Sequence, residues 1–170
     1  MKIPNRSDTA EKRTLATKIA LHFLGSPYIW GGDDPMRGFD CSGFVIEVLK
    51  SIGVLPRSGD WTAANLWELF KRHHVNKPYT GCLVFYRARQ SENSPIIHVE
   101  YCIDAVHTIG ASGGGSKTNT VDDAIRQNAY IKIRPINNDR WVHGFLDPFG
   151  GKQQSLKARC RRQCDENIYS

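Results

Sequence analysis

The sequence predicts an α+β fold, in which helices occupy the first half of the chain and strands follow them. Apolar residues recur at helical spacing in three segments up to about residue 72, and β-type runs come after them. The chain has 170 residues, enough for one domain that buries about two-thirds of its unfolded surface. The sequence has no internal repeat and no long apolar span, which argues against a solenoid, a coiled coil or a membrane helix.

The first helix is expected to begin near Asp8 and to end at about Leu24. Asp8 and Glu11 have the spacing of a capping box. Three apolar residues four positions apart are predicted to face the core, namely Leu15, Ile19 and Phe23.

The second helix carries a cysteine in its first turn. Cys41 precedes one apolar helical face, and Gly53 marks the end of this helix. The first turn of a helix presents unpaired N–H groups and the positive end of the helix dipole, and both favour thiolate over thiol. Cys41 is therefore a candidate nucleophile, although a cysteine taken alone is as often a small buried hydrophobe.

A third helix is expected over about 62–72, with Asp60 as its cap and Leu66, Leu69 and Phe70 directed inward. Strands are expected over 82–87, 96–103, 106–111 and 129–134. The glycine-rich run 112–116 is predicted to be a flexible loop that serves as a cleft wall or as a substrate-binding loop.

A histidine in the second of these strands could complete the chemistry. His98 lies in the β-type run 96–101, and a cysteine–histidine pair is the arrangement that thiol catalysis needs. Gly31 and Gly32, upstream of Cys41, would allow the close backbone approach that an open cleft beside a nucleophile requires.

Five blocks of the sequence, in order, resemble the NlpC-type cell-wall cysteine endopeptidases. They are 28–32, 38–45, 53–57, 81–86 and 98–99, and the resemblance runs from about residue 10 to residue 149. It implies a papain-like α+β fold, with N-terminal helices that include the nucleophile-bearing helix packed on an antiparallel sheet that carries the histidine. It also implies a peptidoglycan hydrolase that cuts stem peptides, for example between D-glutamate and diaminopimelate.

The resemblance assigns roles to individual residues. Cys41 would attack a peptide carbonyl, while His98 would take up the thiol proton and later protonate the leaving amine. Tyr28 would line the pocket, and Asp40 and Ser42 would contact the stem peptide. Asp40 could also cap the helix of Cys41, and the two roles are compatible.

The sequence departs from the family pattern at one position. The family usually places a third polar residue on the strand after His98, often a histidine, and that position is Gly110 here. His107 is the favoured substitute if the hairpin register shifts. Asp104 or Glu100 could serve instead, since both share the parity of His98 on a regular strand, and a backbone carbonyl or water could leave a working dyad.

Charge and cysteine content limit which partners and metal sites the sequence is compatible with. The formal net charge of +6 suits an anionic bacterial envelope, whereas no nucleic-acid-binding motif accompanies it. Residues 1–151 are interpreted as the peptidase domain and 152–170 as a basic C-terminal tail. Cys82 and Cys102 are expected to be buried thiols, while Cys160 and Cys164 lack nearby partners at zinc-ligand spacing. No metal, cofactor or membrane insertion is implied.

The place of action is also an expectation. Residues 1–13 are polar and carry no apolar signal-peptide core, so a protein made in the host cytoplasm would need another route to the wall. The segment 109–116 and the short C-terminal part resemble phage- and prophage-encoded members, which suggests a virion or tail protein or an endolysin. The alternatives are an amidase of the same superfamily, and a non-catalytic tail or wall-binding subunit that retains the fold.

Overall fold

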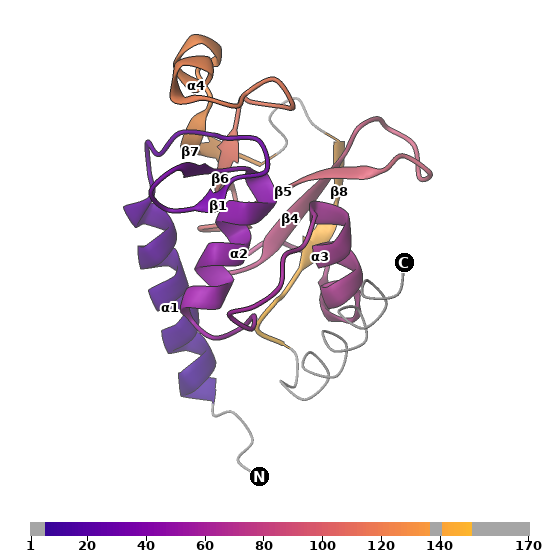
Figure 1. The fold of residues 1–170 in the computed structure, drawn as a ribbon. Helices are drawn as coiled ribbons and strands as arrows, with labels where there is room; N and C mark the ends of the chain where they lie inside the picture. The colour runs from indigo at the N-terminus through magenta and orange to yellow at the C-terminus, as the bar shows by residue number, and fades with distance from the viewer. Residues whose placement is uncertain (1–5, 137–140, 151–170) are drawn as a thin grey trace, which may run out of the picture.

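The computed structural model describes residues 6–136 and 141–150. Its largest feature is a six-stranded antiparallel sheet with the strand order β3-β8-β4-β5-β6-β7 (Figure 1). The strands are β3 (His74–Val75), β4 (Leu83–Arg87), β5 (Ile96–Cys102), β6 (His107–Ser112), β7 (Tyr130–Pro135) and β8 (Trp141–Leu146). The basic tail 152–170, with Cys160 and Cys164, lies outside the described residues.

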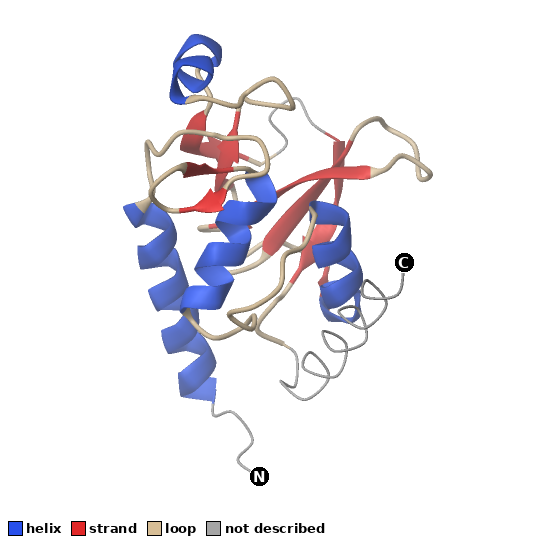
Figure 2. Cartoon of the chain, viewed as in Figure 1, coloured by secondary structure: helices blue, strands red, loops and turns tan. Residues whose placement is uncertain are grey.

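The helices precede the sheet in sequence, apart from a short one near its end. They are α1 (Arg6–His22), α2 (Cys41–Ser51), α3 (Ala63–Phe70) and α4 (Val121–Gln127), with the 3-10 turn η1 (Lys71–His73). A two-stranded ribbon, β1 (Asp33–Asp34) and β2 (Gly38–Phe39), lies beside α2. Helices α2 and α3 pack on β5, and α1 packs on α2 (Figure 2). The predicted α+β fold, with the cysteine helix on an antiparallel sheet, is confirmed.

Each predicted strand is present, with bounds that differ by one or two residues. The sequence did not predict β8, where His143 and Gly144 interrupt the β-type pattern, or α4, which is only seven residues long. Strand β8 pairs with both β3 and β4 and so completes the sheet.

The first helix packs differently from the prediction. Leu15 is 49% exposed, whereas Ala16 and Ala20 are fully buried and Ile19 and Phe23 pack partly against the core. Small residues at the contact allow α1 to lie close to α2, so the buried stripe is rotated by one residue from the predicted one.

The predicted caps of two helices are also wrong. Because α1 begins at Arg6, Asp8 lies inside the first turn, where it pairs with Lys12. Helix α3 is capped by Thr62, whose Oγ1 accepts a hydrogen bond from the Asn65 N–H, and not by Asp60.

The central strands separate two apolar clusters. One set of alternating side chains joins the helices in the main core, which includes Leu83, Phe85, Val99, Tyr101 and Ile109. The alternate set forms a second cluster around Cys82, Val84, Tyr86 and Cys102, and both cysteines are buried thiols as predicted. His98 and Glu100 share the strand parity of Cys102 in this second set.

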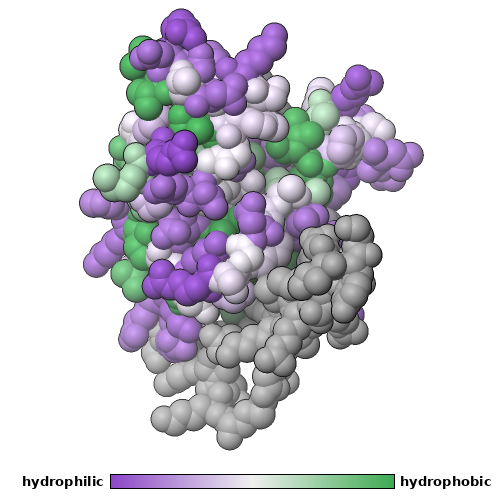
Figure 3. Space-filling view, viewed as in Figure 1, coloured by the Kyte–Doolittle hydropathy of each residue, from purple (hydrophilic) through white to green (hydrophobic). Residues whose placement is uncertain are grey.

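No helix within 6–136 and 141–150 is long and apolar enough to cross a bilayer. The face of the molecule in Figure 3 is mostly hydrophilic, with small apolar patches between polar side chains.

Candidate active site

Cys41 is the first residue of α2, and Asp40 fixes the backbone around it. Asp40 has extended backbone angles, and its Oδ1 accepts hydrogen bonds from the Gly43 N–H at 2.8 Å and from Ser42 Oγ at 3.0 Å. Asp40 is therefore the N-cap of α2, as one of the two interpretations of this residue predicted. The cap holds the half-buried thiol of Cys41 at the positive end of the helix.

The loop before the cysteine passes very close to the start of α2. The N–H of Gly31 donates to Asp40 Oδ2 at 3.2 Å, and the Asp40 N–H donates to the Gly32 carbonyl at 2.9 Å. A Cβ atom on Gly43 would collide with the Gly32 carbonyl oxygen. The glycines thus permit the close approach that the sequence predicted.

One cleft of about 570 Å³ contains most of the predicted site residues. They come from four separate stretches of the chain: Tyr28, Asp40, Cys41, Ser42 and His98, together with Ser112, Gly114 and Gly115 of the glycine-rich loop. The predicted position of that loop as a cleft wall is confirmed. Gly114 lies against the ring of Tyr28 so closely that a Cβ atom at position 114 would overlap the ring.

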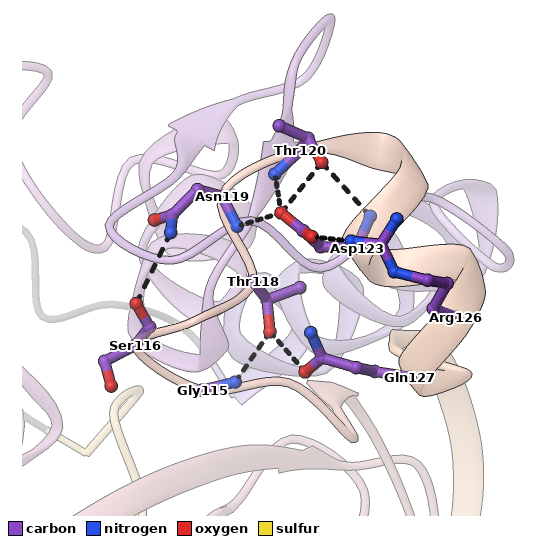
Figure 4. A network of polar contacts seen from close by, with 8 residues as sticks. All are labelled: Gly115, Ser116, Thr118, Asn119, Thr120, Asp123, Arg126 and Gln127. Carbon is purple, nitrogen blue, oxygen red and sulfur yellow. Dashed lines mark hydrogen bonds and ion pairs between the residues drawn. The ribbon is translucent and has the colours of Figure 1, made fainter.

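Hydrogen bonds through Thr118 connect helix α4 to this glycine wall (Figure 4). Buried Thr118 accepts a hydrogen bond from the Gly115 N–H at 3.0 Å and donates to Gln127 Oε1 at 2.8 Å. Its carbonyl accepts from the Trp30 N–H at 2.8 Å. A capping box between Thr120 and Asp123 fixes the start of α4, so a helix that the sequence did not predict shapes the cleft.

His98 lines the same cleft as Cys41 because β5 packs against α2. The Sγ atom of Cys41 is 4.0 Å from the carbonyl oxygen of Ile97, the residue before His98. The Nε2 atom of His98 is 2.9 Å from Oε1 of Glu100. The ring also contacts Tyr86, with 5.7 Å between the ring centroids. The imidazole is thus held by neighbours on its own strand and on β4.

Glu100 is a buried carboxylate with several partners. It is 1% exposed, forms an ion pair with Arg134, and accepts hydrogen bonds from Thr108 Oγ1 at 2.6 Å and Tyr86 Oη at 3.4 Å. Burial alone would raise the pKa of Glu100. The hydrogen bonds from His98 and Thr108 and the charges of His98 and Arg134 outweigh burial and hold this pKa well below its usual range.

Gly110 makes room for Glu100. A Cβ atom at position 110 would lie 2.5 Å from Cγ of Glu100, a separation that real Cβ atoms essentially never show. The position where the resemblance calls for a polar side chain is therefore occupied by the side chain of Glu100, which reaches it from the neighbouring strand.

The predicted contact between His107 and His98 is wrong. Nδ1 of His107 is 3.0 Å from Asp104 Oδ2 in the turn between β5 and β6, and both side chains are nearly half exposed. The hairpin keeps a register in which Cys102 faces Thr108, so His107 lies at the turn, whereas His98 is near the other end of β5. Asp104 is excluded as the partner of His98 for the same reason.

Two further features of the site went unpredicted. Arg134 reaches Glu100 from β7, and Arg87 and Trp141 line the cleft from β4 and β8. None of these residues lies near Cys41 or His98 in sequence, so only strand pairing brings them to the site. Among the described residues, no group of three or more His, Cys, Asp or Glu side chains is placed to hold a metal ion.

Comparison with known proteins agrees with this geometry. The model of the NlpC/P60 family matches residues 25–135. The chain is 34% identical over 110 residues to the Bifunctional muramidase/DL-endopeptidase CwlT of Bacillus subtilis, an alignment that covers 64% of this chain and 29% of that protein. It is 30% identical over 135 residues to the Gamma-D-glutamyl-L-lysine dipeptidyl-peptidase of Bacillus cereus, covering 79% of this chain and 34% of that protein.

A solved structure supports the fold. The crystal structure of an NlpC/P60 family protein from Bacillus cereus superposes with a TM-score of 0.62 at 24% identity, over 81% of this chain and 40% of that chain. The present chain spans about a third of the length of the two curated relatives. With the family model matched over more than half of its length, the chain belongs to the NlpC/P60 family.

Proposed function

We propose that this protein is a cysteine peptidase that hydrolyses stem peptides of bacterial peptidoglycan. The observation that carries the proposal is the cleft itself, in which Cys41 at a capped helix start lies beside His98. The printed names of the two Bacillus relatives, an endopeptidase and a dipeptidyl-peptidase, support the same class of reaction.

The proposed reaction begins at the thiolate of Cys41. Because Nε2 of His98 contacts Glu100, Nδ1 is the ring nitrogen that exchanges a proton with Cys41. The sulfur attacks the peptide carbonyl and forms a C–S bond, while the backbone N–H groups at the start of α2 stabilise the oxyanion. The C–N bond then breaks as the imidazolium protonates the leaving amine. Water, deprotonated by His98, then attacks the thioester, and the C–S bond breaks as the acid is released, which restores the thiolate and the imidazolium.

Glu100 has a positioning role in this scheme. Its carboxylate fixes the orientation of the imidazole and stabilises the imidazolium form, as the orienting group of a catalytic triad does. Arg134 keeps Glu100 ionised although the carboxylate is buried. Glu100 on β5 thus substitutes for the side chain that is absent at Gly110.

We assign the acyl half of the substrate to the part of the cleft near Tyr28, Asp40 and Ser42. Both Asp40 oxygens already accept hydrogen bonds from the protein, so this carboxylate is rigid before any substrate arrives. A fixed carboxylate suits a free amino group or a polar amide of a stem peptide. The proposed scissile bond is one such as D-glutamyl–diaminopimelate.

The test is digestion of purified Gram-negative peptidoglycan by the wild type and by Cys41→Ala, with soluble fragments identified by mass spectrometry. Stem fragments released only by the wild type are expected, and their new termini name the bond. Release of intact stems from the glycan would instead indicate an amidase. Binding to the wall with no release by either protein would favour a non-catalytic wall-binding or tail subunit.

Association with a phage stays a prediction from the resemblance in segment 109–116. According to this prediction, the protein acts at the cell wall, either in a virion tail with tail proteins as partners or as an endolysin. Detection of the protein in purified virions by mass spectrometry would support a tail protein. Its absence from virions, with lysis of host cells on expression, would support an endolysin.

A further inference from the structure

The cleft extends in two directions from His98, and the strand order defines them. One end lies over β6 and β7, where Ser112 ends β6 and the segment of Tyr28 bridges to the start of β7. The other end lies over β4 and β8, where Arg87 and Trp141 form a cross-strand pair. His98 of β5 stands between the two ends.

The proposed function assigns one half of the substrate to each end. The acyl half becomes attached to Cys41 and lies over the start of α2, near Asp40 and Tyr28. The leaving amine takes its proton from His98, so the leaving half continues past the imidazole toward Arg87 and Trp141.

Arg87 carries a positive charge at this leaving end. Its Nε donates to Nδ1 of His143, and its Nη1 donates to the carbonyl oxygen of Ser91 at 2.9 Å. Burial and the nearby charges of Arg87 and His74 lower the pKa of His143, so its imidazole is a neutral acceptor at neutral pH. The two contacts therefore orient the guanidinium without neutralising it.

This arrangement differs from that of three other arginines in the protein, which are paired with carboxylates. Arg13, Arg126 and Arg134 each form an ion pair with a carboxylate. Within the described part of the chain, Arg87 makes no such pair although it lines the reaction cleft. An oriented, uncompensated guanidinium in a cleft is suited to bind a carboxylate of a ligand.

The cleft also continues beyond Arg87. A second hollow of about 230 Å³ shares Arg87 and Trp141 with the main cleft and is lined in addition by Arg89 and Glu92. Trp141 is 46% exposed, so it offers an apolar wall beside the guanidinium. The leaving end therefore has room for a whole amino-acid residue with a charged group.

We propose that Arg87 binds a free carboxylate on the leaving half of the substrate, with Trp141 as the adjacent apolar wall. This inference rests on the proposed function, since it takes the direction of the substrate from the proposed reaction. It names the substrate class more closely: a stem peptide whose leaving residue carries a free carboxylate next to the scissile bond.

The experiment compares two matched peptides, L-alanyl-γ-D-glutamyl-diaminopimelate with a free α-carboxylate on the leaving residue, and the same peptide with that carboxylate amidated. The wild type should cleave the acid with a kcat/KM about tenfold or more above that of the amide. In Arg87→Met the ratio should fall to about 1, and Arg87→Lys should restore part of it. Because the ratio compares two substrates of one protein, partial loss of folded enzyme does not affect it.

Arg72→Ala is the matched control, because Arg72 is an exposed arginine of η1 that lines neither the main cleft nor the second hollow. Its acid-to-amide ratio should equal that of the wild type. Equal cleavage of both peptides by the wild type, or loss of the ratio in Arg72→Ala and not in Arg87→Met, would overturn the assignment.

Failure of the proposed function would look different, since neither peptide would be cleaved. Calorimetric binding of the two peptides to Cys41→Ala then tests the subsite directly. Tighter binding of the acid, abolished by adding Arg87→Met, would support the carboxylate site without any chemistry. Equal binding would refute it.

Discussion

Two histidine–carboxylate pairs lie on the same hairpin, and their contact distances are almost equal. His98 and Glu100 are 2.9 Å apart, and His107 and Asp104 are 3.0 Å apart. The first pair is buried beside the nucleophile, whereas the second is nearly half exposed at the turn. In water a pair of this kind contributes little, but in a buried site the same contact controls orientation and protonation. Burial in the cleft of Cys41, and not the presence of a carboxylate partner, distinguishes His98 from His107.

Removal of the buried charge should produce the largest effect. Glu100→Gln keeps the size of the side chain but removes the partner of the imidazolium, so kcat should fall by about 10²-fold or more. The measurement is peptide hydrolysis over a pH range, because loss of a positioning carboxylate also shifts the pH profile. The matched control is Asp104→Asn at the exposed pair. A similar loss in both variants would show that burial does not separate the two pairs.

The space above Gly110 offers a second way to perturb the buried pair. Gly110→Ala would place a Cβ atom 2.5 Å from Cγ of Glu100 and push the carboxylate away from His98. Activity should fall about tenfold, and the free energy of unfolding should drop by about 1–3 kcal/mol, the usual cost of overpacking. Gly115→Ala is the control for stability, since nothing lies within 4 Å of a Cβ atom there.

A double variant tests whether a side chain at position 110 can replace Glu100 as the support of His98. Glu100→Gly should be nearly inactive, and adding Gly110→His would place an imidazole on β6, where the resemblance expects a polar side chain. The double variant should regain part of the activity lost in Glu100→Gly. If Gly110→His gives no gain in that background, the two positions are not interchangeable supports for His98.

The lowered pKa of Glu100 predicts a pH dependence of stability. A carboxyl group with a depressed folded-state pKa stabilises the fold fully above its unfolded value of about 4.5 and loses this contribution as the pH falls below it. Wild type should therefore lose on the order of 2 kcal/mol of unfolding free energy in acid through this group. Denaturant unfolding of Glu100→Gln between pH 7 and pH 3 should show a flatter dependence. Parallel curves for the two proteins would assign the acid loss to other groups.

Arg134 should set the basicity of the buried pair. Its positive charge disfavours protonation of Glu100 and His98, so in Arg134→Met the imidazolium should persist to higher pH. The alkaline limb of the pH–rate profile should then move upward, while Arg134→Lys should keep it near the wild-type position. A profile that drops in height without moving would mean that Arg134 acts only on the fold.

The sequence predicted much of this site because its signals are local. The helix pattern after Cys41, the cap at Asp40 and the β-type run around His98 are each contained within a few residues. The third residue depends instead on side-chain volume across two strands. Glu100 was among the alternatives by strand parity, but only the folded chain distinguishes it from His107. Glu100 contacts His98 and fills the space above Gly110, whereas His107 lies at the turn.

The unpredicted parts share a physical cause. Arg134, Arg87 and Trp141 reach the site through pairing among β4, β7 and β8, and no short-range pattern encodes such pairing. The prediction that Leu15 faces the core was wrong for a related reason. Which side of α1 is buried depends on how closely α1 can pack against α2. Residues positioned by their own element were predictable, whereas those positioned by a neighbouring element were not.

Mutation of the exposed pair of His107 and Asp104 should change activity least, so this pair is the reference against which the buried pair is judged. Asp104 accepts hydrogen bonds from the N–H groups of Val106 and His107, which lower its pKa and hold the turn, but neither side chain lines the cleft. His107→Ala should therefore leave kcat/KM within about twofold of the wild type, because exposed ion pairs contribute little. Peptide hydrolysis measured beside Glu100→Gln checks this. A tenfold loss in His107→Ala with an unchanged melting temperature would require a second arrangement of the hairpin in which His107, and not Glu100, supports His98.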